Sequence, residues 1–567
     1  MADIFTIGIG GQAGDGVKEA GYTIGALLAK LGYEVFVSLA NPSLIKGGHN
    51  FARVSFSQEK VWCDYDKLDV LIALNEKSVT LHKNELKLNA VVLADSFESI
   101  DLATLGTSAI VLPISSSATA LGAPMIARNS VALGALCHLL DLDFKIMPEI
   151  LQVIFKDKKP ELNIKLADIG FEFLKKAGLS HPKKIEPSQF KKELLDGNTA
   201  FARGLIAGGL DFYISYPMTP STSILHFLAR EQKNYPNLKV IQPENELAAI
   251  NMALGVAYAG KRVAIGSATG GFALMQEAFS FSGAAELPLV IAVSQRQAPA
   301  TGVPTFSSQA DLRLAIHSGH GEFPRIVIAP GDAEEAFLVG ANGLNLAWKY
   351  QTPVIALMDK IVSEHFTTSL IVADQVKIET GKLAEKTGGD YGRYEITADG
   401  ISPMAFPGTS DTVVKITSYE HDEAGIIAEE AGPVKAMIDK RFVKAKTLAS
   451  ELERQETIKI YGDKNADTVI VFWGSTKGPV LEASQYLDQP VKLVQIIWVE
   501  PFDVKKVSVE LAKAKKIINV EGNHNAQMAS LIREKIGLEV SANILKYDSR
   551  PFDPLDLAQK INALCHE

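Results

Sequence analysis

Cysteine is scarce in this chain. Cys63, Cys137 and Cys565 are its only three cysteines, and each stands far from the others in sequence. Three separated thiols cannot form a disulfide framework, and they fit a protein of the reducing cytoplasm. They are also fewer than the four that a 4Fe–4S cluster or a four-cysteine zinc site requires. We therefore expect no iron–sulfur cluster within this chain and assign it no metal ligands.

Long apolar runs and clusters of positive charge are missing too. The longest uncharged run, residues 102–127, contains Pro113 and Pro124, which is typical of strands and loops rather than of a membrane span. The net charge is -9 and no basic block occurs, so neither nucleic acid nor an anionic membrane is an expected partner. Residues 1–5 lack the basic start of a secretory signal. The sequence predicts a cytoplasmic protein.

The length and pattern of the chain predict its architecture. It has 567 residues, more than one hydrophobic core holds, so several domains are expected. Short apolar strands alternate with helical patterns, which predicts an α/β fold of three domains with doubly wound parallel sheets. Glycine, proline, aspartate and threonine are dense in residues 388–412, which indicates an extended, wrapping segment. The three predicted domains are residues 1–180, 190–362 and 461–567, and the extended segment is residues 363–460.

Two features of the first domain could contact an anion. Residues 8–16 form a glycine-rich loop between an expected strand and an expected helix, where the backbone can approach a phosphate closely. A nicotinamide cofactor would also require an acidic residue at the end of the second strand, and residues 37–41 contain none. Lys46 stands before Gly47 and Gly48, where it is exposed enough to reach an anion, although a plain surface lysine is the simpler interpretation.

The second domain contains a stiff strand-to-helix elbow. An apolar strand at residues 210–215 leads into Tyr216, Pro217, Thr219 and Pro220. The two prolines fix φ and remove backbone donors, and Ser221 or Thr222 could cap the helix that follows. Ligand contacts in α/β proteins gather at the carboxyl ends of parallel strands, so Thr219 is a candidate binding residue.

Glu246 and Arg296 also follow strand ends in this domain. Glu246 begins a mostly apolar helix, where a carboxylate needs a partner, although acidic residues are also common in any first helical turn. A lone arginine at a strand end is more often a solvated charge. Because the carboxyl ends of parallel strands share one edge of a sheet, we expect Thr219, Glu246 and Arg296 to lie close together.

Taken together, these motifs resemble the thiamine-diphosphate-dependent 2-oxoacid:acceptor oxidoreductases, and specifically a fused gamma-plus-alpha subunit. The resemblance implies a gamma domain followed by a pyrimidine-binding and a C-terminal transketolase-like domain. It covers nearly the whole chain. The segments that carry it are residues 216–220, the helix of Glu246, Arg296, residues 316–324, 399–403, 406–408 and 520–523, the glycine loop and residues 46–48.

The resemblance implies a role for each candidate residue. Glu246 would hydrogen-bond the aminopyrimidine ring of thiamine diphosphate, with Tyr216 and Pro217 also at the cofactor. Thr219 and Arg296 would hold the carboxylate and oxo group of the substrate, and a guanidinium fork suits a carboxylate. These three residues, Glu246, Thr219 and Arg296, are the predicted catalytic residues. Lys46 and Phe306 would contact the same substrate.

The family resemblance also implies partners. A beta subunit would carry the pyrophosphate site, its Mg²⁺ and at least one 4Fe–4S cluster, which agrees with the cysteine count, and the assembly would be a dimer of alpha–beta units. Coenzyme A would accept the acyl group and ferredoxin the electrons, in oxidative decarboxylation or its reverse. Some relatives, including those that act on 2-oxoglutarate, place arginine where Phe306 stands, so Phe306 predicts a substrate with an uncharged side chain.

Four alternatives stay open at this point. A 2-oxoglutarate-specific member of the same family is the nearest alternative. A thiamine decarboxylase or transketolase-like enzyme that acts alone would need an aspartate and asparagine metal motif, which we do not find. A nicotinamide dehydrogenase would need an acidic residue at the end of the second strand, and this chain has none there. A scaffold subunit that only docks a catalytic partner would not need Glu246.

Overall fold

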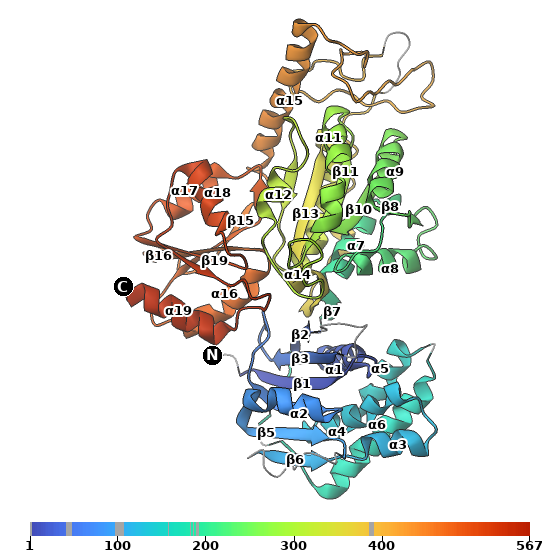
Figure 1. Cartoon of the computed structure of the whole chain (residues 1–567), viewed down its shortest axis with the longest axis vertical. Coiled ribbons are helices and arrows are strands. Elements are labelled where there is room, and N and C mark those ends of the chain that lie inside the picture. The colour runs from blue at the N-terminus through green and yellow to red at the C-terminus, as the bar shows by residue number, and fades with distance from the viewer. Residues whose placement is uncertain are drawn as a thin grey trace. The chain divides into compact units, whose positions relative to one another are not determined.

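The computed structural model describes residues 3–40, 48–96, 107–156, 158–181, 183–184, 186–188, 192–384 and 391–566 (Figure 1). The chain forms two compact units. Unit 1 comprises residues 1–195, 365–370 and 553–556, and unit 2 comprises residues 196–364, 371–552 and 557–567. The division into three domains and an extended segment stays a prediction.

Unit 1 is built on one eight-stranded sheet in the order β6-β5-β4-β1-β3-β2-β14-β7. Strands β6, β5, β4 and β1 run parallel, whereas β3 is antiparallel to both β1 and β2. Only residues 41–48 separate β2 from β3, too few for a parallel crossover, which needs about a dozen. The strands are β1 (Phe5–Gln12), β2 (Glu34–Ala40), β3 (His49–Ser57), β4 (Leu68–Ala73), β5 (Leu86–Ala94), β6 (Ser108–Val111), β7 (Glu193–Asp196) and β14 (Phe366–Ser369).

The helices of unit 1 cover both faces of its sheet. Helix α2 packs on β1 and β4, and α1, α4, α5 and α6 pack on one another. Helices α4 and α6 approach so closely that a Cβ at Gly134 would lie 1.8 Å from the Ala167 carbonyl oxygen, so the contact requires glycine. The helices are α1 (Val17–Leu31), α2 (Glu76–His82), α3 (Ile114–Ala120), α4 (Asn129–Leu139), α5 (Met147–Ile154) and α6 (Pro160–Ala177).

Unit 2 contains two sheets, of seven and five strands. The first, β18-β12-β13-β11-β10-β8-β9, is parallel except for β18, and the second, β15-β17-β16-β19-β20, is parallel except for β15. The strands are β8 (Phe212–Ile214), β9 (Lys239–Ile241), β10 (Val263–Ala268), β11 (Leu289–Gln295), β12 (Ile326–Ile328), β13 (Pro353–Asp359), β15 (Ile458–Gly462), β16 (Thr468–Trp473), β17 (Lys492–Ile496), β18 (Trp498–Glu500), β19 (Lys516–Glu521) and β20 (Ala542–Leu545).

Side chains of β11 alternate between two hydrophobic clusters, which shows that both faces of the larger sheet are covered. Leu289, Ile291 and Val293 join the cluster formed with α9, α10, α11 and α12, and Val290 and Ala292 join the one formed with α7, α8 and α13. The helices are α7 (Gly197–Ala207), α8 (Thr222–Glu231), α9 (Glu246–Tyr258), α10 (Thr269–Leu274), α11 (Gln276–Ala284), α12 (Leu312–Ile316), α13 (Ala333–Tyr350), α14 (Lys360–Glu364), α15 (Ala431–Glu451), α16 (Lys477–Ala483), α17 (Val504–Leu511), α18 (Gln527–Ile536) and α19 (Pro554–His566).

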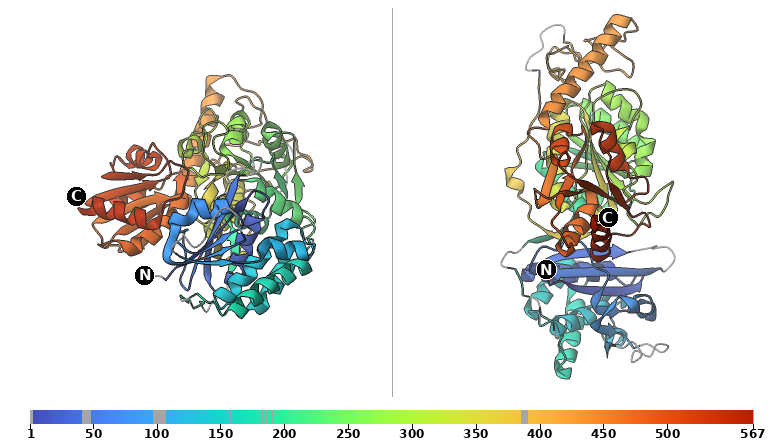
Figure 2. Two further views of the ribbon diagram at one scale, coloured as in Figure 1. Left: turned by 60° about the horizontal axis from the view of Figure 1, so that its bottom comes forward. Right: turned by 90° about the vertical axis from the view of Figure 1, so that its left-hand side faces the viewer.

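The predicted α/β class with three mostly parallel sheets is confirmed. Around the five-stranded sheet, α17 and α18 lie on one side and α16 and α19 on the other (Figures 1 and 2). Among the described residues, no helix combines the length and the hydrophobicity that a membrane span requires.

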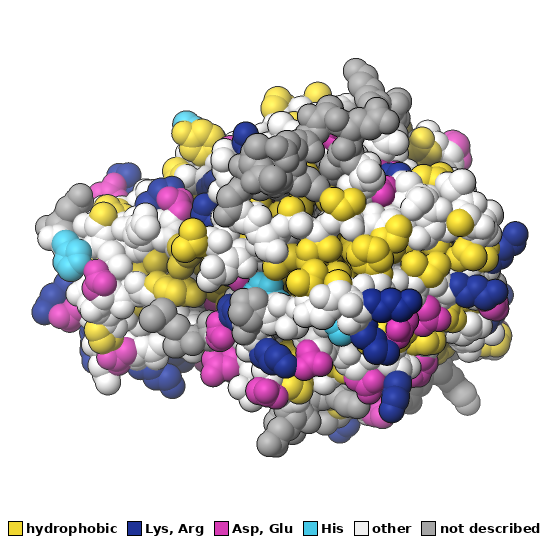
Figure 3. Space-filling view, turned by 90° about the horizontal axis from the view of Figure 1, so that it is seen from below, with side chains coloured by type: hydrophobic (Ala, Val, Ile, Leu, Met, Phe, Trp, Pro, Cys, Tyr) yellow, Lys and Arg dark blue, Asp and Glu magenta, His cyan; other side chains and the backbone are white. Residues whose placement is uncertain are grey.

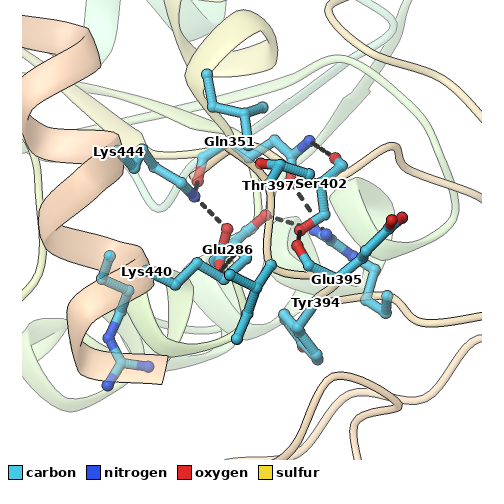
Figure 4. A network of polar contacts seen from close by, with 12 residues as sticks. Glu286, Gln351, Tyr394, Glu395, Thr397, Ser402, Lys440 and Lys444 are labelled. Atoms are coloured by element: carbon cyan, nitrogen blue, oxygen red, sulfur yellow. Dashed lines mark hydrogen bonds and ion pairs between the residues drawn. The ribbon is translucent and has the colours of Figure 1, made fainter. Parts of the chain in front are cut away.

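Helix α15 stands within the segment predicted to be extended. The sequence did not predict this helix because its buried face includes three charged residues, Lys440, Arg441 and Lys444. Glu286, shortly after the end of α11, receives hydrogen bonds from Lys440 and Lys444 (Figure 4). Between residue 376 and α15, the described residues contain no helix or strand, as an extended segment requires.

Part of the surface is hydrophobic. Figure 3 shows hydrophobic side chains gathered in a band across one face. The exposed large hydrophobic residues of unit 1 include Leu121, Met125, Ile126, Val153 and Phe173. Contiguous exposed hydrophobic surface is typical of proteins that contact other proteins.

Candidate functional site

The elbow after β8 is held by hydrogen bonds from the elements around it. Ser215 Oγ donates to the Gly266 carbonyl oxygen of β10 at 2.6 Å, and Asn198 Nδ2 donates to the Pro220 carbonyl oxygen at 2.8 Å. The Thr219–Pro220 peptide bond is cis. Ser221 is the N-cap residue of α8, but its hydroxyl donates to the Met218 carbonyl oxygen instead of capping the helix, because its backbone is helical rather than extended.

Arg296 meets the elbow across the sheet edge. It directly follows β11, and β10 lies between β11 and β8 in the sheet. Its NH1 group donates to the Thr219 carbonyl oxygen at 2.8 Å. Burial lowers the pKa of Arg296, but a guanidinium stays charged at any physiological pH. One of its five N–H donors is used in this bond, and the others can hold an anion.

Glu246 is the first residue of α9 and is almost completely buried. The residue is 4% exposed, and its Oε1 atom is buried with no hydrogen-bond partner among the described residues. Asn245 caps the helix by accepting from the Ala248 amide at 2.8 Å. An unpaired buried carboxylate oxygen costs stability, so this oxygen is suited to a donor that a ligand supplies.

Small residues lie between Glu246 and the elbow after β8. A Cβ at Gly271 would lie 2.7 Å from Glu246 Oε1 and 2.1 Å from Ser267 Oγ, so only glycine fits between them. Ser267 Oγ in turn lies 3.7 Å from the sulfur of Met218. The structure therefore gathers Glu246, Thr219 and Arg296 at one edge of the sheet, in agreement with the argument from strand ends.

Two further residues at this edge were missed by the sequence analysis. Gln295 Nε2 and Thr305 Oγ1 are buried and have no partner among the described residues. Gln295 Oε1 accepts from the Asp311 amide at 3.1 Å, and Thr269 Oγ1 donates to the Asp311 carboxylate at 2.7 Å. Burial raises the pKa of Asp311. The only sequence signal was adjacency, since Gln295 precedes Arg296 and Thr305 precedes Phe306.

Phe306 lies in a loop that returns to Arg296. The Gln297 amide donates to the Phe306 carbonyl oxygen at 3.1 Å, and the Val303 amide donates to the Gln297 carbonyl oxygen at 3.0 Å. Phe306 is half-buried, and the guanidinium carbon of Arg550 lies 3.8 Å from the centre of its ring. Lys46 lies outside the described residues. Tyr216 is partly exposed at the start of the elbow, and Pro217 is half-buried.

Two family models match the chain. Residues 203–440 match a model described as pyruvate flavodoxin/ferredoxin oxidoreductase, thiamine diphosphate-binding. Residues 6–173 match a model described as pyruvate ferredoxin/flavodoxin oxidoreductase. These two matches together cover most of the chain and agree with the resemblance inferred from the motifs.

Individual proteins are similar over the full length. The 2-oxoacid:ferredoxin oxidoreductase alpha subunit of a Sulfolobus species is 32% identical over 96% of this chain and 94% of its own, and that of Saccharolobus solfataricus is 32% identical over 98% and 97%. A solved structure of 2-oxoglutarate:ferredoxin oxidoreductase from Magnetococcus marinus, with 2-oxoglutarate, coenzyme A and succinyl-CoA bound, matches with a TM-score of 0.90 and 32% identity over 99% of both chains. The chain therefore belongs to the 2-oxoacid:ferredoxin oxidoreductase family, as an alpha subunit.

Proposed function

We propose that this chain, together with a beta subunit, oxidises a 2-oxoacid with coenzyme A to an acyl-CoA and CO₂. The bond between the 2-oxo carbon and the carboxylate breaks, and the acyl carbon forms a bond to the sulfur of coenzyme A. The two electrons released pass singly to two ferredoxins, and the thiol proton leaves to solvent. The observation that carries the proposal is Glu246, a buried carboxylate whose Oε1 has no hydrogen-bond partner among the described residues and which lies at the same sheet edge as Thr219 and Arg296.

The residues at this edge fit the pyrimidine end of thiamine diphosphate. Glu246 Oε1 can accept a hydrogen bond from the protonated ring nitrogen, and the absence of a side chain at Gly271 keeps that oxygen accessible. Tyr216 and Pro217 would line the same cofactor from the elbow. When bound, thiamine diphosphate supplies the nucleophilic carbon that the chemistry at the 2-oxo group requires. Glu246 would hold the proton at the ring nitrogen and fix the orientation of the ring.

Arg296 and Thr219 would bind the reacting end of the substrate. A guanidinium donates two parallel N–H bonds to a carboxylate, and Arg296 retains donors beyond the one given to Thr219. The Thr219 hydroxyl would donate to the 2-oxo oxygen, and Lys46 would reach the same substrate. Phe306 carries no charge, which favours a substrate with an uncharged side chain. Reductive carboxylation, the reverse reaction, would use the same residues.

The missing parts of the site would belong to the partner. Cys63 and Cys137 are buried and Cys565 is half-buried, and three separated thiols are too few to ligate a 4Fe–4S cluster. We assign the pyrophosphate site, its Mg²⁺ and at least one 4Fe–4S cluster to a beta subunit. The working assembly would be a dimer of alpha–beta units in the cytoplasm.

Replacing Glu246 separates an enzyme from a docking scaffold. Glu246→Gln keeps the size of the side chain but makes it a poor acceptor for a protonated ring nitrogen. We expect turnover of pyruvate and 2-oxoglutarate in the assembled complex to fall by at least 100-fold, the loss typical of a removed proton-transfer group. The matched control is Glu244→Gln, which removes an exposed carboxylate two residues earlier. Unchanged turnover in Glu246→Gln would favour the scaffold.

A further inference from the structure

Arg550 is an exposed arginine to which the proposed reaction assigns no role. Its guanidinium carbon lies 3.8 Å from the centre of the Phe306 ring, which is a cation–π contact. Its backbone amide donates to Asp548 Oδ1 at 3.0 Å, which fixes the local chain. Among the described residues, no carboxylate lies within ion-pair distance of the guanidinium. Arg550 therefore contacts a ring and, among the described residues, forms no direct side-chain ion pair.

The contact with Phe306 uses none of the N–H donors of Arg550. A cation over an aromatic face uses the plane of the guanidinium, while its N–H groups point outward in that plane. Those groups can form two parallel hydrogen bonds with a carboxylate or a phosphate. Phe306 therefore orients Arg550 without satisfying any of its donors.

A small surface hollow beside Arg550 is lined by polar and cationic residues. Its lining contains hydroxyls and two cations and no carboxylate. Lys546 Nζ lies 2.8 Å from Asp548 Oδ2. Burial would raise the pKa of Asp548, but its hydrogen bonds to Lys546 and to the Arg550 amide, together with the charges of Lys546 and Arg550, lower it. One carboxylate therefore faces two cations. Asp359 lies beneath the pocket, and its oxygens accept from the backbone amides of Ser475, Ile361 and Val362. The polar lining residues are Ser307, Ser308, Gln309, Ser475, Thr476, Lys546, Ser549 and Arg550.

This pocket is connected to the candidate site through the backbone. Phe306 is hydrogen-bonded to Gln297, the residue after Arg296, and Ser307 follows Phe306 directly. A ligand that is held at Arg296 could place a second anionic group near Arg550. Both substrate classes of the proposed reaction offer one, since a dicarboxylic 2-oxoacid has a distal carboxylate and coenzyme A has phosphates.

We propose that Arg550, oriented by Phe306, binds a carboxylate or phosphate group of a ligand of the proposed reaction. The choice of ligands rests on the proposed function, but the anion site itself does not. If the 2-oxoacid has an uncharged side chain, as Phe306 by itself predicts, the anion is a phosphate of coenzyme A.

Binding and turnover should be measured on the assembled alpha–beta complex with Arg550→Gln. The probes are 2-oxoglutarate against pyruvate, and coenzyme A against its analogue without the 3′-phosphate, each titrated by calorimetry and assayed for KM and kcat. We expect a rise of at least tenfold in the dissociation constant and KM for one anionic probe, with little change for its matched neutral or truncated analogue. Arg533→Gln is the control, because it removes an exposed arginine paired with Glu539 elsewhere on unit 2.

Each outcome decides the matter. A loss confined to 2-oxoglutarate assigns a carboxylate, and a loss confined to intact coenzyme A assigns the 3′-phosphate. Equal behaviour of Arg550→Gln and Arg533→Gln towards all four probes would overturn the proposal, as would failure of the unaltered complex to bind either anionic probe. Binding without turnover of any 2-oxoacid would refute the proposed function and leave the anion site standing. Phe306→Leu should give a smaller loss for the same probe, because Arg550 keeps its charge but loses its orientation.

Discussion

Removal of the Glu286 carboxylate should release α15 from the rest of unit 2. Glu286 is buried and accepts from Lys440 Nζ at 2.6 Å and from Lys444 Nζ (Figure 4). Arg393 donates to its backbone carbonyl at 2.8 Å. Burial would raise the pKa of Glu286, but the charges of Lys444, Lys440 and Arg393 outweigh burial and hold that pKa well below its ordinary value. One carboxylate therefore compensates several buried cations.

The loss of stability in Glu286→Gln can be estimated from the number of cations that lose their counter-charge. Glu286→Gln keeps the volume but leaves two buried ammonium groups without a counter-charge, and breaking a buried ion pair in this way costs about 3–5 kcal/mol. Because about 1.4 kcal/mol corresponds to a factor of ten, the amides of α15 should exchange hydrogen roughly 100- to 4000-fold faster if local opening limits their exchange. Burial also lowers the pKa of Lys444, so Lys444 binds a proton more tightly in the unfolded protein than in the folded one. The stability that Glu286→Gln loses should therefore become smaller as pH rises, because Lys444 then loses its charge.

Hydrogen exchange of the full chain, followed by mass spectrometry, measures this directly. Asp439→Asn is the matched control, since it removes an exposed carboxylate from the same helix, where it pairs with Lys435. Exposed pairs of this kind contribute about 0.3–0.5 kcal/mol, so exchange in the control should change by no more than a few-fold. If exchange of α15 in Glu286→Gln were no faster than in Asp439→Asn, the network would not be what anchors the helix.

Two further predictions concern unit 1. Burial, followed by the charges of His82 and Lys77, lowers the pKa of His49 to about 4. Between about pH 6.5 and pH 4 the unfolded protein therefore binds more protons than the folded one, and the stability of unit 1 should decrease as the pH is lowered through this range. His49→Phe should flatten that part of the pH profile of exchange in β1 and β3, and an equally steep profile would contradict the assignment. Gly170→Ala would place a Cβ 1.8 Å from the Val131 carbonyl oxygen, so α4 and α6 must separate and thermal stability should fall clearly, whereas the exposed Gly178→Ala should give a smaller loss.

The grouping of Thr219, Glu246 and Arg296 could be predicted from the sequence because it depends on topology. Parallel strands end at one edge of a sheet, so residues that follow strand ends meet there whatever the details of packing. Glu246 was singled out because an acidic residue before an apolar helix is visible in the pattern. The unpartnered atoms of Gln295 and Thr305 were not visible, because whether a buried polar atom has a partner depends on neighbours from other strands and loops.

The sequence by itself determined the α/β class, the strand-end cluster and the family, since these depend on local pattern and on motifs read along the chain. Only the tertiary structure decided how charges far apart in sequence pair. In the folded chain Lys440 and Lys444 are buried against Glu286, which lets a segment with a polar sequence form a helix. Arg550 lies over the ring of Phe306, so an uncharged residue has a charged neighbour. Electrostatic energy depends on distance and burial in space, and neither quantity is contained in sequence spacing.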